Sequence, residues 1–170
     1  MRESMTNASL RELYFDELSD LYDAEEQGMR VLPRLAEAVR AQELRDAITK
    51  HVEESRLHLE RLELIFTHWG EHRQAKTCAG LAGIVQEADE RLQRLAKGDA
   101  RDAAIIGAVQ RIEHYEIASY RSARTYASRL NRLDDLRLLQ ETLEEEVRTD
   151  RRLSELGEAH IIDTERLGAA

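Results

Sequence analysis

The sequence predicts an all-α protein in which four long helices form two antiparallel hairpins, joined by a long crossover that contains a short helix. Three observations support this prediction. Only one proline and eight glycines occur among the 170 residues, and Leu, Ala, Glu and Arg, which favour helices, dominate. Apolar side chains recur at spacings of three and four over four long stretches. Two of the breaks between these stretches are short and one is long, which indicates where the hairpins and the crossover lie.

The first hairpin is expected from two helices, at about residues 10–40 and about residues 44–69. Ser9 and Glu12 have the spacing of a capping box, which marks the start of a helix. The second helix is expected to stop at Gly70. Because the break between the two helices is short, they should lie antiparallel.

The second hairpin is expected from helices at about residues 101–130 and about residues 134–162, with a short turn between them. Residues 71–99 form the predicted crossover, with a helix of about four turns inside residues 81–96. Two long hairpins joined by one long crossover are the connectivity of ferritin-like bundles, whereas simple up-and-down bundles have only short loops. The sequence therefore predicts a ferritin-like four-helix bundle.

The domain limits follow from the same stretches. Residues 9–163 are expected to form one ferritin-like domain, with a flexible N-terminal tail at residues 1–8 and a C-terminal tail at residues 164–170. A chain of 170 residues is about the size of one domain and is long enough to bury a core.

Charge and hydropathy argue against several functions. The net charge of −9 disfavours a nucleic-acid partner, because neutralising phosphates requires an excess of basic residues. The apolar stretches are too short to span a membrane, and the beginning of the sequence lacks the pattern of a signal peptide. Cys78 is the only cysteine, so an internal disulfide is not possible. We therefore expect a cytoplasmic protein with no membrane partner.

Acidic side chains interrupt each apolar stripe near its middle. Glu25 lies on the stripe of the first helix, and Glu116 lies at the centre of the third stripe with Glu113 on its flank. The fourth helix contributes a pair of acids one turn apart, and the second helix contributes an acid and a histidine at i and i+4. The seven candidate metal ligands are Glu25, Glu54, His58, Glu113, Glu116, Glu146 and Asp150.

These seven residues are expected to share one layer of the bundle. Each lies about 12 to 19 residues from its hairpin turn, which corresponds to roughly 20 to 28 Å at 1.5 Å per residue. Six carboxylates and an imidazole held together away from water would cost several kcal/mol per ion without a compensating cation. The central faces show no arginine at this level, so bound metal ions are the expected cations.

The ligand types favour iron or manganese over zinc, because the predicted set is rich in oxygen and contains one nitrogen ligand. The set departs from the usual pattern of two lone glutamates and two Glu-x-x-His pairs. Tyr22 and Tyr120 are expected to point toward the centre, and His51 is expected either to orient Glu54 or to be a satisfied boundary histidine. The alternatives are core tyrosines whose hydroxyls need a partner, and acids paired with arginine on a partly solvated face. Glu144 and Glu145 are expected to be solvated.

Four segments resemble the YciE/YciF family of bacterial ferritin-like stress proteins: "LYDAEEQ", "HVEES", "RDAAIIGAVQRIEHYEIASY" and "ETLEEEVRTD". The resemblance covers about residues 10–163, and "EHYEIASY" and "TLEEE" are its most specific parts. It implies a rubrerythrin-like bundle, a homodimer, a dinuclear iron centre and a ferroxidase or peroxide-handling role. Glu113 and Glu116 would match the two glutamates three residues apart on the third helix of rubrerythrins. The chain has no rubredoxin-like cysteine domain to deliver electrons.

Two functional hypotheses from different classes follow. In the first, two iron ions, bridged by Glu54 and Glu146 or by Glu116, react with dioxygen or hydrogen peroxide in an oxidoreductase of the stress response. In the second, the protein is a non-enzymatic helical dimer or scaffold in which a metal only stabilises the bundle. A manganese catalase-like activity lies between the two, because the same ligands accept manganese.

Overall fold

A computed structural model of the chain describes the backbone of residues 2–168 and the side chains of residues 10–159. Met1, Ala169 and Ala170 lie outside the described residues. The described backbone is all-helical, with five helices and no strand within residues 2–168. The helices are α1 (Arg2–Ala38), α2 (Gln42–Trp69), α3 (Ala79–Leu92), α4 (Asp99–Arg129) and α5 (Leu133–Gly168).

The all-helical class predicted from the sequence is confirmed, and most helix ends lie within a few residues of their predicted positions. The start of α1 and the end of α5 differ from their predicted positions. The backbone of α1 is already helical at Arg2, and that of α5 continues to Gly168. Residues 2–8 and 164–168, which were expected to be tails, thus extend these helices, and the domain limits at 9 and 163 stay predictions.

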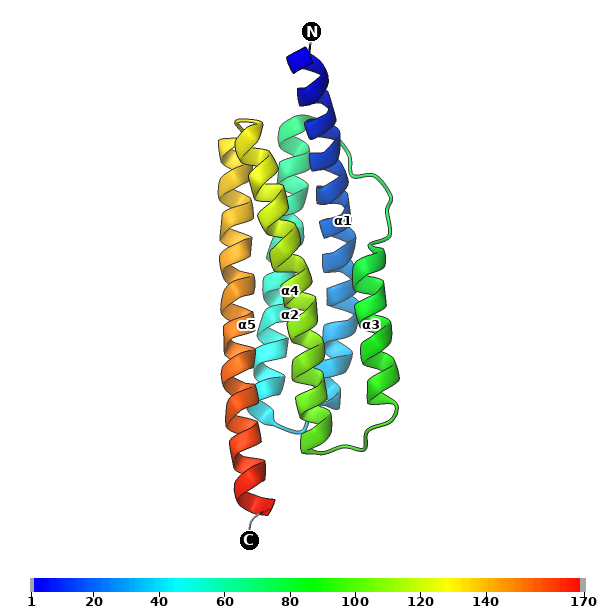
Figure 1. The fold of residues 1–170 in the computed structure, drawn as a ribbon, viewed down its shortest axis with the longest axis vertical. Helices are drawn as coiled ribbons and strands as arrows, with labels where there is room; N and C mark the ends of the chain where they lie inside the picture. Colours follow the sequence, from blue (N-terminus) through cyan, green and yellow to red (C-terminus); the bar gives the residue numbers. More distant parts are fainter. Residues whose placement is uncertain (1, 169–170) are drawn as a thin grey trace.

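The four long helices run side by side along the long axis of the molecule, as Figure 1 shows. α1 packs against α2 and α4, and α5 packs against the same two helices, so that each long helix packs against two of the other long helices. Neighbouring helices run in opposite directions (Figure 1). The short helix α3 lies outside this set of four, against α1 and α4.

The helix ends show why the chain turns where it does. Gly70 follows α2 in a left-handed conformation with φ of 64°, and the N–H of Glu71 donates to the carbonyl of Phe66. Glycine adopts this conformation without a steric penalty, so the predicted stop at Gly70 is confirmed. Asn131 has φ of 56° in the turn between α4 and α5, and asparagine is one of the few other residues that tolerate this region.

Buried carboxylates join the two hairpins at each end of the molecule. Asp102 on α4 accepts hydrogen bonds from the backbone N–H groups of Arg40 (3.0 Å) and Ala41 (2.9 Å) in the turn between α1 and α2. At the other end, Asp135 on α5 accepts from the indole of Trp69 at 2.7 Å and contacts His68 at 3.0 Å. Both aspartates are almost fully buried. These contacts hold the helices at a fixed height relative to one another.

The apolar core consists of two clusters, one toward each end of the molecule. One cluster contains residues that lie near the turn between α1 and α2, among them Leu32, Ile48, Ile105 and Leu153. The other cluster contains Tyr14, Leu62, Tyr120 and Leu139, among others. Buried polar residues lie between the two clusters along the sequence of each long helix. Among residues 2–168, no helix has the length and apolar character needed to cross a membrane.

The contact between Asp102 and the first turn gives a prediction for stability. Asp102→Ala should lower the free energy of unfolding by about 2–3 kcal/mol, because two backbone N–H groups lose their acceptor. Urea denaturation followed by circular dichroism measures the change. Asp46→Ala is the matched control, since Asp46 is exposed and bonds only Gln42 on its own helix. Equal stability of the two variants would contradict the assigned role of Asp102.

Candidate metal centre

A layer of buried polar side chains separates the two apolar clusters. Its members come from α1, α2, α4 and α5, and each has no more than 1% of its surface exposed. The layer consists of Glu25, His51, Ser55, His58, Glu113, Glu116 and Glu146. Ionisable side chains are rarely buried to this extent unless they are paired or bind a metal.

Helical periodicity explains how the chain delivers these groups to one place. On α2, His51, Ser55 and His58 follow one another at spacings of four and three, which is the period of a buried stripe. On α4, Glu113 and Glu116 lie one turn apart and are flanked by the buried Ile112, Ile117 and Tyr120. The polar groups therefore occupy positions at which a soluble helix usually carries core residues.

The first group of possible ligands contains His51, Glu113, Glu116 and Glu146. One ligand atom from each of these side chains lies within 4.8 Å of those of the other three. His51 Nε2 is 2.9 Å from Glu113 Oε1 and 3.8 Å from Glu146 Oε2. Three carboxylates and one imidazole thus surround a single point.

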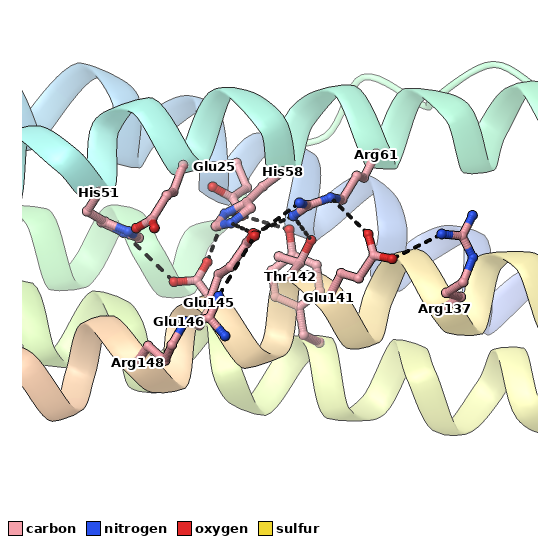
Figure 2. Close-up of polar contacts among 12 residues, drawn as sticks. Glu25, His51, His58, Arg61, Arg137, Glu141, Thr142, Glu145, Glu146 and Arg148 are labelled. Atoms are coloured by element: carbon pink, nitrogen blue, oxygen red, sulfur yellow. Dashed lines mark hydrogen bonds and ion pairs between the residues drawn. The ribbon is translucent and has the colours of Figure 1, made fainter.

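The second group contains Glu25, His58 and Glu146, whose ligand atoms also lie within 4.8 Å of one another. His58 Nδ1 is 3.1 Å from Glu25 Oε1 and 3.1 Å from Glu146 Oε1. Glu146 belongs to both groups and contributes its Oε1 to the contact with His58 and its Oε2 to the contact with His51. Figure 2 shows Glu146 between the two histidines.

Most oxygens in this layer lack a hydrogen-bond donor among the described residues. Both carboxylate oxygens of Glu113, Glu116 and Glu146 are buried without a hydrogen bond, as is Oε2 of Glu25. His51 Nε2 is close to Glu113, but the pair lacks hydrogen-bond geometry. Buried polar atoms are normally satisfied, and each exception needs an explanation. Seven unpaired carboxylate oxygens beside two histidines form a set of metal ligands that suits divalent cations.

Burial also changes the ionisation of the glutamates. Removal from water raises the pKa of Glu113 to about 8 and that of Glu146 to about 8. The charge of Glu113 acts in the same direction on the pKa of Glu146, whereas the contact with Glu146 partly offsets the rise at Glu113. For the same reason the pKa of Glu116 lies well above its usual range. Without a cation, these side chains hold protons that water would remove from an exposed glutamate at neutral pH.

The mutual attraction of His58 and Glu25 shifts their pKa values in opposite directions. Burial acts to lower the pKa of His58, but the charge of Glu25 and the hydrogen bonds that His58 donates to carboxylates raise it well above its usual value. Burial acts to raise the pKa of Glu25, and the charge of His58 outweighs that effect and lowers it. Without a metal, this pair is therefore an imidazolium beside a carboxylate. In effect, a proton supplies the positive charge.

Three side chains support the second group from outside. Tyr120 donates a hydrogen bond of 2.7 Å to Glu25 Oε1. Glu145 Oε2 lies 3.0 Å from His58 Nε2, and Arg61 donates hydrogen bonds to both carboxylate oxygens of Glu145. Figure 2 shows this chain of contacts from His58 through Glu145 to Arg61. Burial acts to raise the pKa of Glu145, but the hydrogen bonds from His58 and Arg61 lower it to about 2.

Two of the sequence-based expectations need correction. Glu145 was expected to be a solvated member of the Glu144–Glu146 run, but its side chain is only 17% exposed and contacts His58. His51 was expected to be a satisfied boundary histidine or to orient Glu54, but it lies in the first group together with three glutamates. In the case of Glu145, the decisive neighbour is an arginine on another helix, which helical periodicity does not reveal.

The structure does not bring every predicted ligand into the two groups. Glu54 is 19% exposed and pairs with Lys50 at 2.7 Å. Asp150 is 23% exposed and contacts His114 at 3.1 Å. Tyr22, expected to face the centre, instead donates a hydrogen bond of 2.7 Å to Glu63. Glu25, His58, Glu113, Glu116 and Glu146 are brought together, and Tyr120 contacts one of them.

Carboxylates and histidines that four helices direct into a common interior are typical of helical proteins that hold metal ions. The chain matches the family described as a domain of unknown function, DUF892, over residues 9–165. It therefore belongs to this family.

Individual relatives agree with this assignment. The chain is 37% identical over 153 residues to Protein YciF of Escherichia coli (strain K12), covering 89% of this chain and 92% of that protein. The crystal structure of the E. coli stress protein YciF superposes with a TM-score of 0.86 at 36% identity, covering 89% of this chain and 96% of that one. The resemblance found in the sequence is thus confirmed.

Two further structures are similar to this chain. YcfI from Rhodopseudomonas palustris, described as a candidate structural protein, has a TM-score of 0.83 at 33% identity and covers 85% of this chain and 92% of its own. A protein from Xanthomonas campestris has a TM-score of 0.74 at 18% identity, covering 95% of this chain and 99% of its own. The last comparison shows a shared fold alone.

The raised pKa values predict how the stability of the cation-free protein depends on pH. Glu113 and Glu146 have folded pKa values of about 8 against a reference value of 4.5, so the folded state retains protons that the unfolded chain releases. Stability should therefore fall as the pH rises from about 5 to about 8, and His58 contributes in the same direction because its pKa is also raised.

Thermal unfolding in the presence of a chelator, measured between about pH 6 and about pH 8.5, tests this expectation. Glu113→Gln should flatten the decline in melting temperature, because one of the titrating groups is removed. Glu53→Gln, an exposed substitution, should leave the decline unchanged. A melting temperature that is constant or rises over this range would show that the glutamates are ionised without a cation.

Proposed function

We propose that this protein is a ferritin-like non-haem di-iron protein that acts as a ferroxidase or as a peroxide-reducing oxidoreductase in the stress response. The observation that supports the proposal most strongly is the position of Glu146, which belongs to both groups of possible ligands. A carboxylate has two oxygens, so Glu146 can bind one cation in each group. Each cation would then have a histidine of its own, His51 in one group and His58 in the other.

The helix arrangement supports the ferritin-like part of this proposal. Two antiparallel pairs, α1 with α2 and α4 with α5, are joined by a long connection that contains α3. Ferritin-like bundles have this connectivity and build their metal centres from inward-facing side chains of the four long helices. In this chain the two groups draw on α1, α2, α4 and α5, while α3 contributes no member.

The donor set supports iron, with manganese as the second choice. Four carboxylates and two imidazoles make an oxygen-rich set without sulfur, and such a set suits iron or manganese better than a structural zinc site. The four glutamates also carry enough negative charge to stabilise the more highly charged ferric state. The set is less anionic than the sequence suggested, because Glu54 and Asp150 do not belong to it.

The residues of the chain prepare the site for redox chemistry in three ways. The two apolar clusters exclude water from either side of the polar layer. Tyr120 and Glu145 hold Glu25 and His58 in place through hydrogen bonds. Glu113, Glu116 and Glu146 can release protons when a cation binds, because their pKa values are raised. A bound pair of ferrous ions supplies two electrons, which with two protons are enough to reduce one hydrogen peroxide molecule to two of water.

A non-enzymatic role is the second candidate, and one comparison favours it. YcfI, which is 33% identical to this chain, is described as a candidate structural protein. In this reading the cations only neutralise the glutamates and stabilise a helical scaffold. For either role we propose a homodimer, which the family resemblance implies, and a cytoplasmic location.

Metal analysis of protein purified without oxygen, followed by loading with ferrous ions, tests the proposal. We expect about two ions per chain, because two groups of ligands are present. Addition of hydrogen peroxide should then produce ferric absorbance in the near ultraviolet and consume peroxide. Fewer than about one ion per chain would contradict the metal-binding proposal. Ions that stay bound with no spectral change would favour the scaffold.

Substitution of the shared carboxylate should weaken both positions. Glu146→Ala is expected to lower iron loading from about two ions to fewer than one, because each group loses a ligand. Glu60→Ala on the exposed face of α2 is the control and should load as the unaltered protein does. Equal loading of the two variants, measured by equilibrium dialysis, would show that Glu146 is not a ligand.

A further inference from the structure

We propose that Glu145 is a positioning residue that holds the imidazole of His58 so that Nδ1 faces Glu25 and Glu146. The inference rests on the proposed function, in which the group formed by Glu25, His58 and Glu146 holds a cation. It assigns a role to a residue that the two groups of possible ligands do not contain. It also explains why Glu145, as well as Glu146, turns toward the interior in the run Glu144–Glu146.

The two nitrogens of His58 have different surroundings. Nε2 lies 3.0 Å from Glu145 Oε2, whereas Nδ1 lies 3.1 Å from one oxygen of Glu25 and 3.1 Å from one oxygen of Glu146. An ionised carboxylate can only accept a hydrogen bond, so Nε2 donates a proton to the bond with Glu145. In a neutral imidazole, this bond leaves the lone pair on Nδ1. The lone pair therefore points to where a cation would meet the two carboxylates.

Arg61 holds the carboxylate of Glu145 in position. Its Nη1 donates to Glu145 Oε2 and its Nη2 donates to Glu145 Oε1 at 3.1 Å. Such a two-point contact sets the plane of the carboxylate as well as its position. Arg61 Nη1 also donates to the buried hydroxyl of Thr142 at 3.1 Å, which holds the guanidinium against α5. Figure 2 shows Arg61, Thr142 and Glu145 on the same side of His58.

The other histidine has no equivalent support. Neither ring nitrogen of His51 makes a hydrogen bond to any described residue. The two groups thus differ in how well their histidines are held, although Glu146 belongs to both. Loss of Glu145 should consequently weaken the position that contains His58 more than the position that contains His51.

Binding of Co²⁺ to the whole protein tests the inference, because this ion accepts the same ligands and has visible absorption bands that report its surroundings. Glu145→Ala should weaken one of two bound Co²⁺ ions by about 10- to 100-fold, as is typical when the carboxylate partner of a metal-bound histidine is removed. The bands of that ion should also change. Glu145→Gln restores an acceptor for Nε2–H and should recover most of the affinity.

Glu144→Gln is the matched control, because Glu144 is the preceding residue and is exposed, with Gln140 on its own helix as its partner. Its Co²⁺ affinity and absorption bands should equal those of the unaltered protein. Glu145→Leu keeps the bulk of the side chain without an acceptor and replaces Glu145→Ala if that variant does not fold.

Nitrogen NMR of the protein loaded with Zn²⁺, which is diamagnetic, separates positioning from a merely structural role. In the unaltered protein, His58 should show a protonated Nε2 and a metal-bound Nδ1. In Glu145→Ala this single tautomer should be lost. If both Co²⁺ ions bind with unchanged affinity and His58 keeps its signals, the inference is overturned. If the unaltered protein binds no Co²⁺, the proposed function itself fails.

Discussion

Four glutamate side chains from three helices share a layer that is almost closed to solvent. Protons, His58 or bound cations must offset the repulsion among them. The four are Glu25, Glu113, Glu116 and Glu146. Like charges held together in a medium of low polarity repel more strongly than they do in water, and each also loses its hydration. Without a cation the layer is tolerable only because protons remain on most of these carboxylates and because His58 offsets Glu25. The apolar clusters on either side supply the stability that lets the chain hold such a layer.

The fold could be predicted from the sequence because its evidence is periodic and local. Helix α2 ends at Gly70 because only a residue tolerant of positive φ fits there, and a glycine at the end of an apolar stripe signals this directly. Glu25 and Glu116 could be placed in the interior for a related reason, since each lies on the central line of an apolar stripe. The lengths of α1 and α5 were harder to predict, because polar sequences continue a helix or end it with little difference in pattern.

The remaining parts of the site depend on information that periodicity does not contain. Glu54 lies at the edge of its stripe, where a small rotation of the helix decides between interior and surface, and the structure pairs it with Lys50. Asp150 follows the periodicity of its stripe, but the structure pairs it with His114 on α4, a contact that periodicity does not reveal. His51 shares a stripe with Ser55 and His58, so a signal for it was present. The role of Glu145 rests on Arg61, which is 84 residues away in the sequence. The two groups of possible ligands are also unequal, because Glu145 contacts His58, whereas neither ring nitrogen of His51 makes a hydrogen bond to a described residue.

Anomalous X-ray diffraction from crystals loaded with Mn²⁺ shows whether two cations bind among the buried glutamates. Two anomalous peaks are expected within the polar layer. One should lie among His51, Glu113 and Glu116, the other between Glu25 and His58, with Glu146 in reach of both. Peaks confined to surface carboxylates, with the interior glutamates free of metal, would contradict the account.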